Sequence, residues 1–253
     1  MKIRPGVELA SLTDVGCQRE NNEDSSGYWE PSDDASFLAS GRLAIVADGM
    51  GGHEGGQIAS RLAVETFTKS YAAANDPEPQ KRLLTALNQA HKNIQQHANQ
   101  NPRLNSMGTT CTALALVERR LYFVHVGDSR LYLVREGKLQ TLSRDHTLIA
   151  RLLEKGLIQP EQAKDHPQKH VLTSALGIPG EELEIDAPPK PLPLQPGDTL
   201  MLCTDGLWGQ MQASEIEQSL ASQAPAVACR SLVDLAKKRG GPDNITLQVL
   251  RID

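Results

Sequence analysis

Residues 43–53 of the chain, LAIVADGMGGH, join an apolar run to an acidic, glycine-rich turn. Residues 199–207, TLMLCTDGL, repeat this plan far downstream. Each run has strand character and ends in an Asp-Gly pair, Asp48-Gly49 in the first case and Asp205-Gly206 in the second. Asp-Gly at a strand end places a carboxylate at a sheet edge, and the glycine lets the backbone turn sharply or approach a ligand. With further Asp-bearing turns beside them, two such strand ends can form an oxygen-rich pocket for hard divalent cations.

The length of 253 residues favours one large domain, residues 1–253. The formal net charge of −5 argues against general nucleic-acid binding, which favours clustered Lys and Arg. No apolar run is long enough to span a membrane, and residues 1–5 lack the apolar core of a signal peptide. We therefore expect a cytoplasmic protein with no nucleic-acid or membrane partner. A monomer is the default for a lone domain of this size.

The cysteines carry no recognisable site. All four are scattered, with no paired spacing for zinc or disulfides. None is followed by arginine six residues on, so the thiolate loop with which cysteine phosphatases cradle phosphate is missing. Cys111 and Cys203 lie in apolar strand-like runs, where we expect them to be small buried hydrophobes.

Hydrophobic periodicity predicts an α+β fold. Helical spacing covers residues 58–71, 80–99, 213–220 and 227–239, and strand-like runs cover 7–13, 42–47, 110–117, 121–126, 131–135, 139–142, 199–204 and 245–252. The segment of about residues 145–183 is polar and irregular, which predicts a flap inserted between strands. We expect a central β-sandwich of two mostly antiparallel sheets, flanked by helix pairs on its outer faces, with the flap near the active site.

Several aspartates lie beside turn signals and form a candidate metal site. Taken singly, each is a common turn residue and could be structural. Five at strand edges, with glycine at most of them, indicate ligands. Carboxylate ligation with no paired Cys or His favours Mg²⁺ or Mn²⁺ over zinc, and the regular twelve-residue calcium loop is missing. The candidate ligands are Asp24, Asp48, Asp128, Asp205 and Asp243, with Glu23 in support.

These motifs, in this order and spacing, resemble those of the metal-dependent serine/threonine protein phosphatases of type 2C, in their compact bacterial form. The resemblance runs from about residue 7 to residue 252, nearly the whole chain. It rests on Thr13-Asp14-Val15-Gly16 with Arg19 and Asn22-Glu23-Asp24, DGMGGH at 48–53, Gly108-Thr109-Thr110, Val126-Gly127-Asp128-Ser129-Arg130, Asp145-His146, His170-Val171-Leu172-Thr173 with Ala175-Leu176-Gly177, Asp205-Gly206-Leu207-Trp208, and Gly241-Pro242-Asp243-Asn244.

The resemblance implies a two-metal site at one end of the sandwich, holding two Mn²⁺ or Mg²⁺ ions with a third, weaker site possible. It implies attack on phosphoserine or phosphothreonine by a water that both ions activate, with no covalent enzyme intermediate. The substrates would be phosphorylated proteins, the targets of a cognate serine/threonine kinase. The implied metal contacts are a bridging carboxylate from Asp48, the backbone carbonyl of Gly49, direct ligation by Asp205 and Asp243, water-mediated contacts from Glu23 and Asp24, and the extra site at Asp128.

By the same resemblance, Arg19 would grip the substrate phosphate, since a guanidinium offers a rigid fork for two phosphate oxygens. Without the surrounding motif, Arg19 would be a surface salt-bridge residue. One departure concerns Gly209, which stands where relatives often have an acidic residue. It has no side-chain ligand, and this puts the third metal site in doubt.

A second departure concerns the proton donor for the leaving oxygen, for which histidine is the usual residue near neutral pH. Some relatives carry a histidine directly after the Asp-Gly pair, where this chain has Met50. His53 is the candidate, against the alternative that it only caps the following helix. His146 and His170 are second choices, His125 is expected to be packed, and His91 and His97 are expected to be solvated on a helix.

Three functions remain open: a phosphoprotein phosphatase, a non-catalytic phosphoprotein-binding module on the same fold, and a metal-dependent phosphatase of small phosphorylated metabolites. The second is disfavoured because every central ligand is present. The third is harder to exclude because surface loops, which a fold does not fix, select the substrate.

Overall fold

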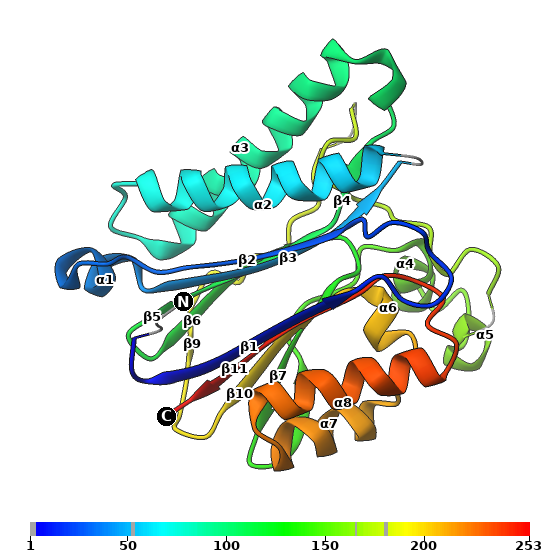
Figure 1. Cartoon of the computed structure of the whole chain (residues 1–253). Coiled ribbons are helices and arrows are strands. Elements are labelled where there is room, and N and C mark those ends of the chain that lie inside the picture. Colours follow the sequence, from blue (N-terminus) through cyan, green and yellow to red (C-terminus); the bar gives the residue numbers. More distant parts are fainter. Residues whose placement is uncertain (1–3, 52–53, 165, 180–181) are drawn as a thin grey trace.

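The structure is a computed structural model that describes residues 4–51, 54–164, 166–179 and 182–253. Two antiparallel sheets pack face to face, and helices cover the outer face of each (Figure 1). The predicted α+β sandwich is therefore confirmed. The first sheet has the order β1-β11-β10-β7-β8, with β1 at Val7–Asp14, β11 at Ile245–Ile252, β10 at Thr199–Cys203, β7 at Arg130–Arg135 and β8 at Lys138–Thr141.

The second sheet has the order β2-β3-β5-β6-β9, and β4 pairs with β3. Its strands are β2 at Asp24–Trp29, β3 at Arg42–Met50, β4 at Gly108–Thr109, β5 at Cys111–Val117, β6 at Arg120–Val126 and β9 at Leu192–Pro193. The sequence did not predict β2, because the string DSSGYW has no apolar run. It also did not predict β9, which lies in the proline-rich segment of residues 187–196.

The central strands are buried on both faces, which explains why they appear in the sequence as continuous apolar runs. Along β3, Leu43, Ile45 and Ala47 contact the helix layer, while Ala44 and Val46 contact the interior between the sheets. This alternation follows from the two-residue period of a strand. In β10, Met201 and Cys203 likewise face helices, and Leu200 and Leu202 face the interior.

The helix pairs lie where the sequence predicts them. α2 (Gly55–Ala73) and α3 (Pro79–Gln100) pack on the second sheet, and α7 (Ala213–Ser222) and α8 (Pro225–Lys238) pack on the first (Figure 1). A capping box at Gln212 and Glu215 begins α7. A short helix, α1 (Asp34–Ser40), was not predicted, although the Asp33 side chain caps it by accepting a hydrogen bond from the Ser36 amide.

The inserted segment contains two short helices, α4 (Leu148–Glu154) and α5 (Pro160–Lys164). It is anchored to the sandwich by short β-bridges, Thr109 with Leu176 and His125 with Asp186, and internally by a bridge between Thr147 and Leu172. The remaining elements are a 3₁₀ turn at Pro102–Leu104 and α6 at Asp205–Trp208. Across the described residues, no helix combines the length and apolar character that a bilayer crossing requires.

Candidate metal centre

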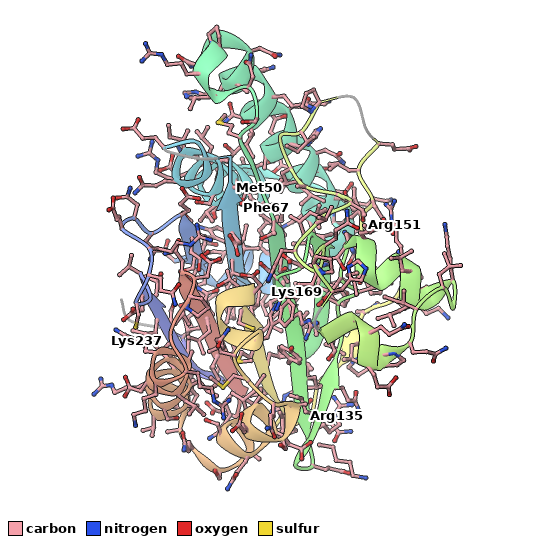
Figure 2. All side chains as sticks on the ribbon, turned by 90° about the vertical axis from the view of Figure 1, so that its right-hand side faces the viewer. Met50, Phe67, Arg135, Arg151, Lys169 and Lys237 are labelled. Atoms are coloured by element: carbon pink, nitrogen blue, oxygen red, sulfur yellow. The ribbon has the colours of Figure 1, made fainter. Side chains whose placement is uncertain are left out.

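The two sheets bring their acidic strand ends to the same end of the sandwich, the end that Figure 2 faces. Asp24 and Asp48 lie directly opposite each other in the β2–β3 register. Asp205 is the first residue of α6, directly after β10, and Asp243 comes just before β11. Thr204 joins the two sheets here, because its hydroxyl donates to Asp24 Oδ2 at 2.8 Å while its amide donates to the Thr246 carbonyl at 3.0 Å.

The glycines of both Asp-Gly pairs are required by close packing of backbone on backbone. A Cβ at Gly49 would lie 2.0 Å from the Gly56 carbonyl oxygen and 2.7 Å from that of Glu23. A Cβ at Gly206 would lie 2.0 Å from the Asn244 carbonyl oxygen. These contacts are far shorter than van der Waals distance, so only glycine lets the strand ends approach one another around the acidic cluster.

The carboxylates lie close enough to oppose one another's ionisation. Burial raises the pKa of Asp48 well above its usual value, and the charges of Asp24, Asp205, Asp128 and Asp243 raise it further. Burial, with smaller contributions from Asp205 and Asp243, raises the pKa of Asp24 to about 7. Burial and the charge of Asp205 raise the pKa of Asp128 as well. Asp24, Asp48, Asp128 and Asp205 therefore lie near enough to one another to interact electrostatically.

Two of these carboxylates have buried oxygens to which no described residue donates a hydrogen bond, namely Asp24 Oδ1 and Asp205 Oδ1. Such oxygens are costly to leave unpaired in a protein interior. A hard divalent cation would satisfy them, and an all-oxygen donor set fits Mg²⁺ or Mn²⁺. Among the described residues, no group of three or more His, Cys, Asp or Glu side chains has an arrangement that could hold a metal ion. The individual ligand assignments therefore stay predictions.

Two basic side chains contact candidate ligands. Arg19 Nη2 donates to Asp243 Oδ2 at 2.8 Å, and the Arg19 side chain is 52% exposed. His170 Nδ1 lies 3.5 Å from Asp205 Oδ2, and this contact raises the pKa of His170. Arg19 thus lies at the acidic cluster with much of its guanidinium open to solvent. Arg19 therefore makes the exposed salt bridge that the alternative expects, and its phosphate-binding role stays a prediction.

Glu23 lies in the same loop as Arg19. Burial raises its pKa, and the charge of Arg19 opposes that rise. The Glu23 amide donates to Asn244 Oδ1 at 2.7 Å, and Asn244 Nδ2 donates to the carbonyls of Val15 and Asn21. Asn244 therefore ties this loop to the start of β11. The sequence contained Asn244 in a motif, but gave no signal that it holds the loop.

Asp128 is held by a cluster whose function the sequence did not predict. His146 Nδ1 accepts from the Gly127 amide at 3.2 Å, and the Gly127 carbonyl lies 2.9 Å from His125 Nε2. Gly127 has φ +106°, a conformation that favours glycine. Trp208 Nε1 donates to the Asp128 carbonyl at 2.9 Å. These bonds fix the turn that presents the Asp128 carboxylate.

A guanidinium completes this cluster. Arg130 lies 3.6 Å from the centre of the Trp208 ring and makes a two-pronged contact with Asp145, the shortest bond being 2.7 Å. Trp208 is half-buried and packs on the rim of the core. Gly209, the residue after it, is exposed. The third metal site at Asp128 stays a prediction.

The histidine expectations have mixed outcomes. His53 lies outside the described residues. His170 reaches a candidate ligand, whereas His146 is buried behind Gly127. His125 is fully buried, as predicted, and burial and the nearby His146 lower its pKa to about 3, so it is neutral. The expectation of a solvated His91 is wrong: the ring is half-buried and its Nδ1 accepts from the Gly177 amide at 3.1 Å.

His97 is likewise only partly exposed. The cysteine expectations hold. Cys111 and Cys203 are fully buried, and burial raises the pKa of both thiols. Neither thiol is therefore placed or ionised to act as a nucleophile.

Comparisons with known proteins agree with this architecture. A family model described as protein phosphatase 2C matches residues 20–237. Serine/threonine protein phosphatase PstP of Mycobacterium tuberculosis is 36% identical over 247 residues, which cover 96% of this chain and 44% of that protein. Serine/threonine phosphatase stp of Listeria monocytogenes is 35% identical over 246 residues, covering 95% of this chain and 94% of that protein. The chain thus spans less than half of the first relative and nearly all of the second.

A solved structure of a PstP catalytic domain in complex with two manganese ions is also similar. It superposes with a TM-score of 0.83 at 31% identity, covering 98% of this chain and 99% of that one. The similarity therefore extends over both sheets and the inserted segment.

Proposed function

This chain belongs to the protein phosphatase 2C family, and we propose that it is a metal-dependent phosphatase that releases phosphate from phosphoserine and phosphothreonine in proteins. One observation carries the proposal: acidic strand ends from both sheets converge on one another beside the exposed guanidinium of Arg19. Carboxylates alone would repel a phosphate monoester. A guanidinium beside them can bind the phosphate once divalent cations offset the negative charge of the carboxylates.

Two Mn²⁺ or Mg²⁺ ions fit the residues present. The unpartnered oxygens of Asp24 and Asp205, and the carboxylates whose pKa values rise through burial and then through mutual repulsion, support this proposal. Asp48 would bridge the ions, the Gly49 carbonyl would bind one of them, and Asp205 and Asp243 would hold one. When bound, such ions activate a water and reverse the local sign of the charge. Glu23 and Asp24 would act mainly through water, and Asp128 would serve a third, weaker site.

Within this site, Arg19 binds and orients the phosphate. Its guanidinium fork can contact two phosphate oxygens at once, as a lysine cannot. It is already within hydrogen-bonding distance of Asp243, so only a side-chain rotation is needed for it to turn to the substrate. The leaving serine or threonine oxygen needs a proton. His53 is the first candidate for this role and His170, which contacts Asp205, is the second.

Further proposals concern the setting of the protein. The relatives are named serine/threonine phosphatases, which supports phosphorylated proteins as substrates. A serine/threonine kinase that phosphorylates the same targets is the expected counterpart. A cytoplasmic monomer without nucleic-acid or membrane partners remains our proposal for its state and location.

The test is phosphate release from a phosphothreonine peptide, measured with Mn²⁺ and with excess chelator. We expect turnover only with the metal, and no loss after alkylation of the exposed Cys17. Sugar phosphates and nucleotides, run in parallel, should be poor substrates. Full turnover in chelator would refute the metal site. A preference for the small phosphates would instead support the metabolite phosphatase, and phosphopeptide binding without turnover would indicate a binding module.

A further inference from the structure

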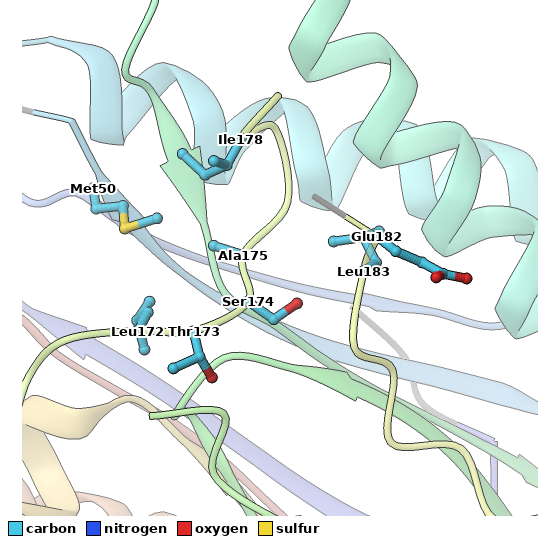
Figure 3. Close-up of a pocket in the computed structure, with 8 residues that line it drawn as sticks. All are labelled: Met50, Leu172, Thr173, Ser174, Ala175, Ile178, Glu182 and Leu183. Carbon is cyan, nitrogen blue, oxygen red and sulfur yellow. The ribbon is translucent and has the colours of Figure 1, made fainter. Parts of the chain in front are cut away.

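A cavity of about 60 Å³ opens between the end of β3 and the inserted segment (Figure 3). Its apolar wall consists of Met50, Leu172, Ala175, Ile178 and Leu183. Since about 10–15 Å³ of such space holds one water molecule, the cavity has room for a small aliphatic side chain.

Gly108, on β4, lies beneath two of these side chains. A Cβ at Gly108 would lie 2.9 Å from Met50 Cε and 3.0 Å from Ile178 Cδ1. The ends of both apolar side chains therefore converge on this glycine. Glycine at this position therefore lets Met50 and Ile178, two of the residues that line the cavity, pack directly on β4.

The polar groups of the lining do not make it a polar pocket. The Ser174 hydroxyl lies 3.0 Å from the Glu184 amide, from which it accepts, and 3.3 Å from the Glu184 carbonyl. The Thr173 hydroxyl is buried without a hydrogen-bond partner among the described residues, but in Figure 3 it points away from Met50 and Ile178. The Glu182 carboxylate also points away from Met50 there. What faces the space is therefore mainly methyl, methylene and thioether groups, which favour an apolar occupant.

The pocket lies two residues along β3 from the acidic centre. Asp48 and Met50 are two residues apart on β3, and residues i and i+2 of a strand lie on the same face, roughly 7 Å apart. An extended peptide has the same period. A peptide that presents one side chain to the acidic centre presents the side chain two positions away at a comparable distance, on the same side.

We propose that this pocket binds a small aliphatic side chain two residues from the phosphorylated serine or threonine of a protein substrate. The inference rests on the proposed function and adds a sequence preference to it. Met50, Ala175 and Ile178 select the side chain through its shape and apolar surface. The carboxylates and Arg19 act on the phosphate, so the two parts of the site can be tested separately.

The test compares phosphothreonine peptides that carry glycine at all neighbouring positions with peptides that carry valine at one of them. Valine two positions away, on one side of the phosphothreonine, should raise kcat/KM by about ten-fold over glycine, the effect of a small apolar group in an apolar pocket. Valine directly next to the phosphothreonine should have little effect. Para-nitrophenyl phosphate, which has no neighbouring side chain, measures each variant's activity without the pocket.

Two variants locate the preference. Ala175→Leu fills the pocket and should bring the valine-to-glycine ratio close to one. Ile178→Ala enlarges the pocket and should move the preference from valine to leucine or phenylalanine, which keeps the test valid if Ala175→Leu fails to fold. Val171→Ala is the matched control, because Val171 lies in the same segment, is 45% exposed and is not part of the lining. Its ratio should equal that of the wild type.

Equal kcat/KM for peptides with valine and with glycine at every neighbouring position would overturn the inference. So would a preference that both pocket variants leave unchanged. Either result would leave the proposed function intact. A preference confined to the adjacent position would also overturn it. If para-nitrophenyl phosphate and every peptide remain intact with Mn²⁺, the proposed function fails, and this inference fails with it.

Discussion

Replacing Asp24 with asparagine should stabilise the protein in the presence of chelator while weakening metal binding. Asp24 is buried at 8% exposure, lies opposite Asp48, and has one oxygen without a hydrogen-bond donor among the described residues. Its pKa rises from the usual 3.8 to about 7, chiefly because of burial. The fold thus holds a carboxylate in a place where ionisation is unfavourable.

The size of the effect follows from that shift. Each pKa unit corresponds to about 1.4 kcal/mol, so keeping Asp24 ionised costs the fold about 4 kcal/mol above pH 7. The amide of an asparagine at this position would still offer an oxygen to the Thr204 hydroxyl and would carry no charge. We expect Asp24→Asn to recover about 2–4 kcal/mol of unfolding free energy, which raises Tm on the order of 10 °C for a chain of this length.

The pH dependence shows whether ionisation of Asp24 stabilises or destabilises the fold. A carboxyl whose folded pKa is raised stabilises the fold below its unfolded pKa, and this stabilisation is lost as the pH rises through the folded value. With chelator present, the wild type should therefore lose stability relative to Asp24→Asn between about pH 4 and pH 7, and the difference should level off above that. Thermal unfolding followed by circular dichroism across this range measures the difference.

The matched control is Asp14→Asn at the end of β1. Asp14 accepts a 2.7 Å bond from Lys237, and although burial opposes it, that ion pair holds the pKa of Asp14 below its usual value. The control should therefore lose stability at neutral pH, where Asp24→Asn gains it. Saturating Mn²⁺ should stabilise the wild type more than Asp24→Asn, in proportion to its tighter binding. A stability difference that is independent of pH, or an Asp24→Asn protein less stable than the wild type near pH 8, would refute the reasoning.

Three further predictions concern activity. Asp205→Ala should nearly abolish turnover, and isothermal titration with Mn²⁺ should show a lost or weakened site; unchanged titration would remove Asp205 from the ligands. Arg19→Ala should raise KM more than it lowers kcat, if the guanidinium holds ground and transition states alike, and Arg19→Lys should restore only part of the loss. If His53 donates the proton, His53→Ala should slow phosphoserine peptides by about 10²–10⁴-fold and barely slow para-nitrophenyl phosphate, whose leaving group is a stable anion. The same divergence in His170→Ala, with none in His53→Ala, would assign the role to His170.

The sequence predicted the elements whose continuous apolar composition already indicates that they are buried. The runs at 43–47 and 199–204 are apolar on both faces, so their strands could be located without knowing their partners. β2 could not be located in this way, because it has few apolar residues and its position depends on contacts. A Cβ at Gly27 would lie 2.7 Å from Val64 Cγ1, so this strand fits beneath α2 only because residue 27 has no side chain.

The residues of the candidate site likewise divide into those that the sequence could identify and those that it could not. Asp48 and Asp205 could be found because a strand and a glycine flank each of them. The residues that hold the Asp128 turn could not be given that function, because His125, His146 and Trp208 come from three separate segments that meet only in the folded chain. Sequence spacing identifies residues that lie together in one motif. Residues that position others through hydrogen bonds come from separate segments, which only the folded structure brings together.

The acidic centre is built on strand ends, and this explains how the fold tolerates it. Mutual repulsion would spread five carboxylates apart if they lay on mobile loops. Here the ladder of β2 and β3 fixes the separation of Asp24 and Asp48, and the glycine contacts at Gly49 and Gly206 fix the approach of the neighbouring chains. The free energy of the sandwich core therefore offsets the electrostatic cost of keeping these carboxylates together, and the proposed cations would bind without first ordering them. Because the pocket beside Met50 is formed partly by the inserted segment, substitutions there can change substrate preference while the strand-borne ligands stay in place.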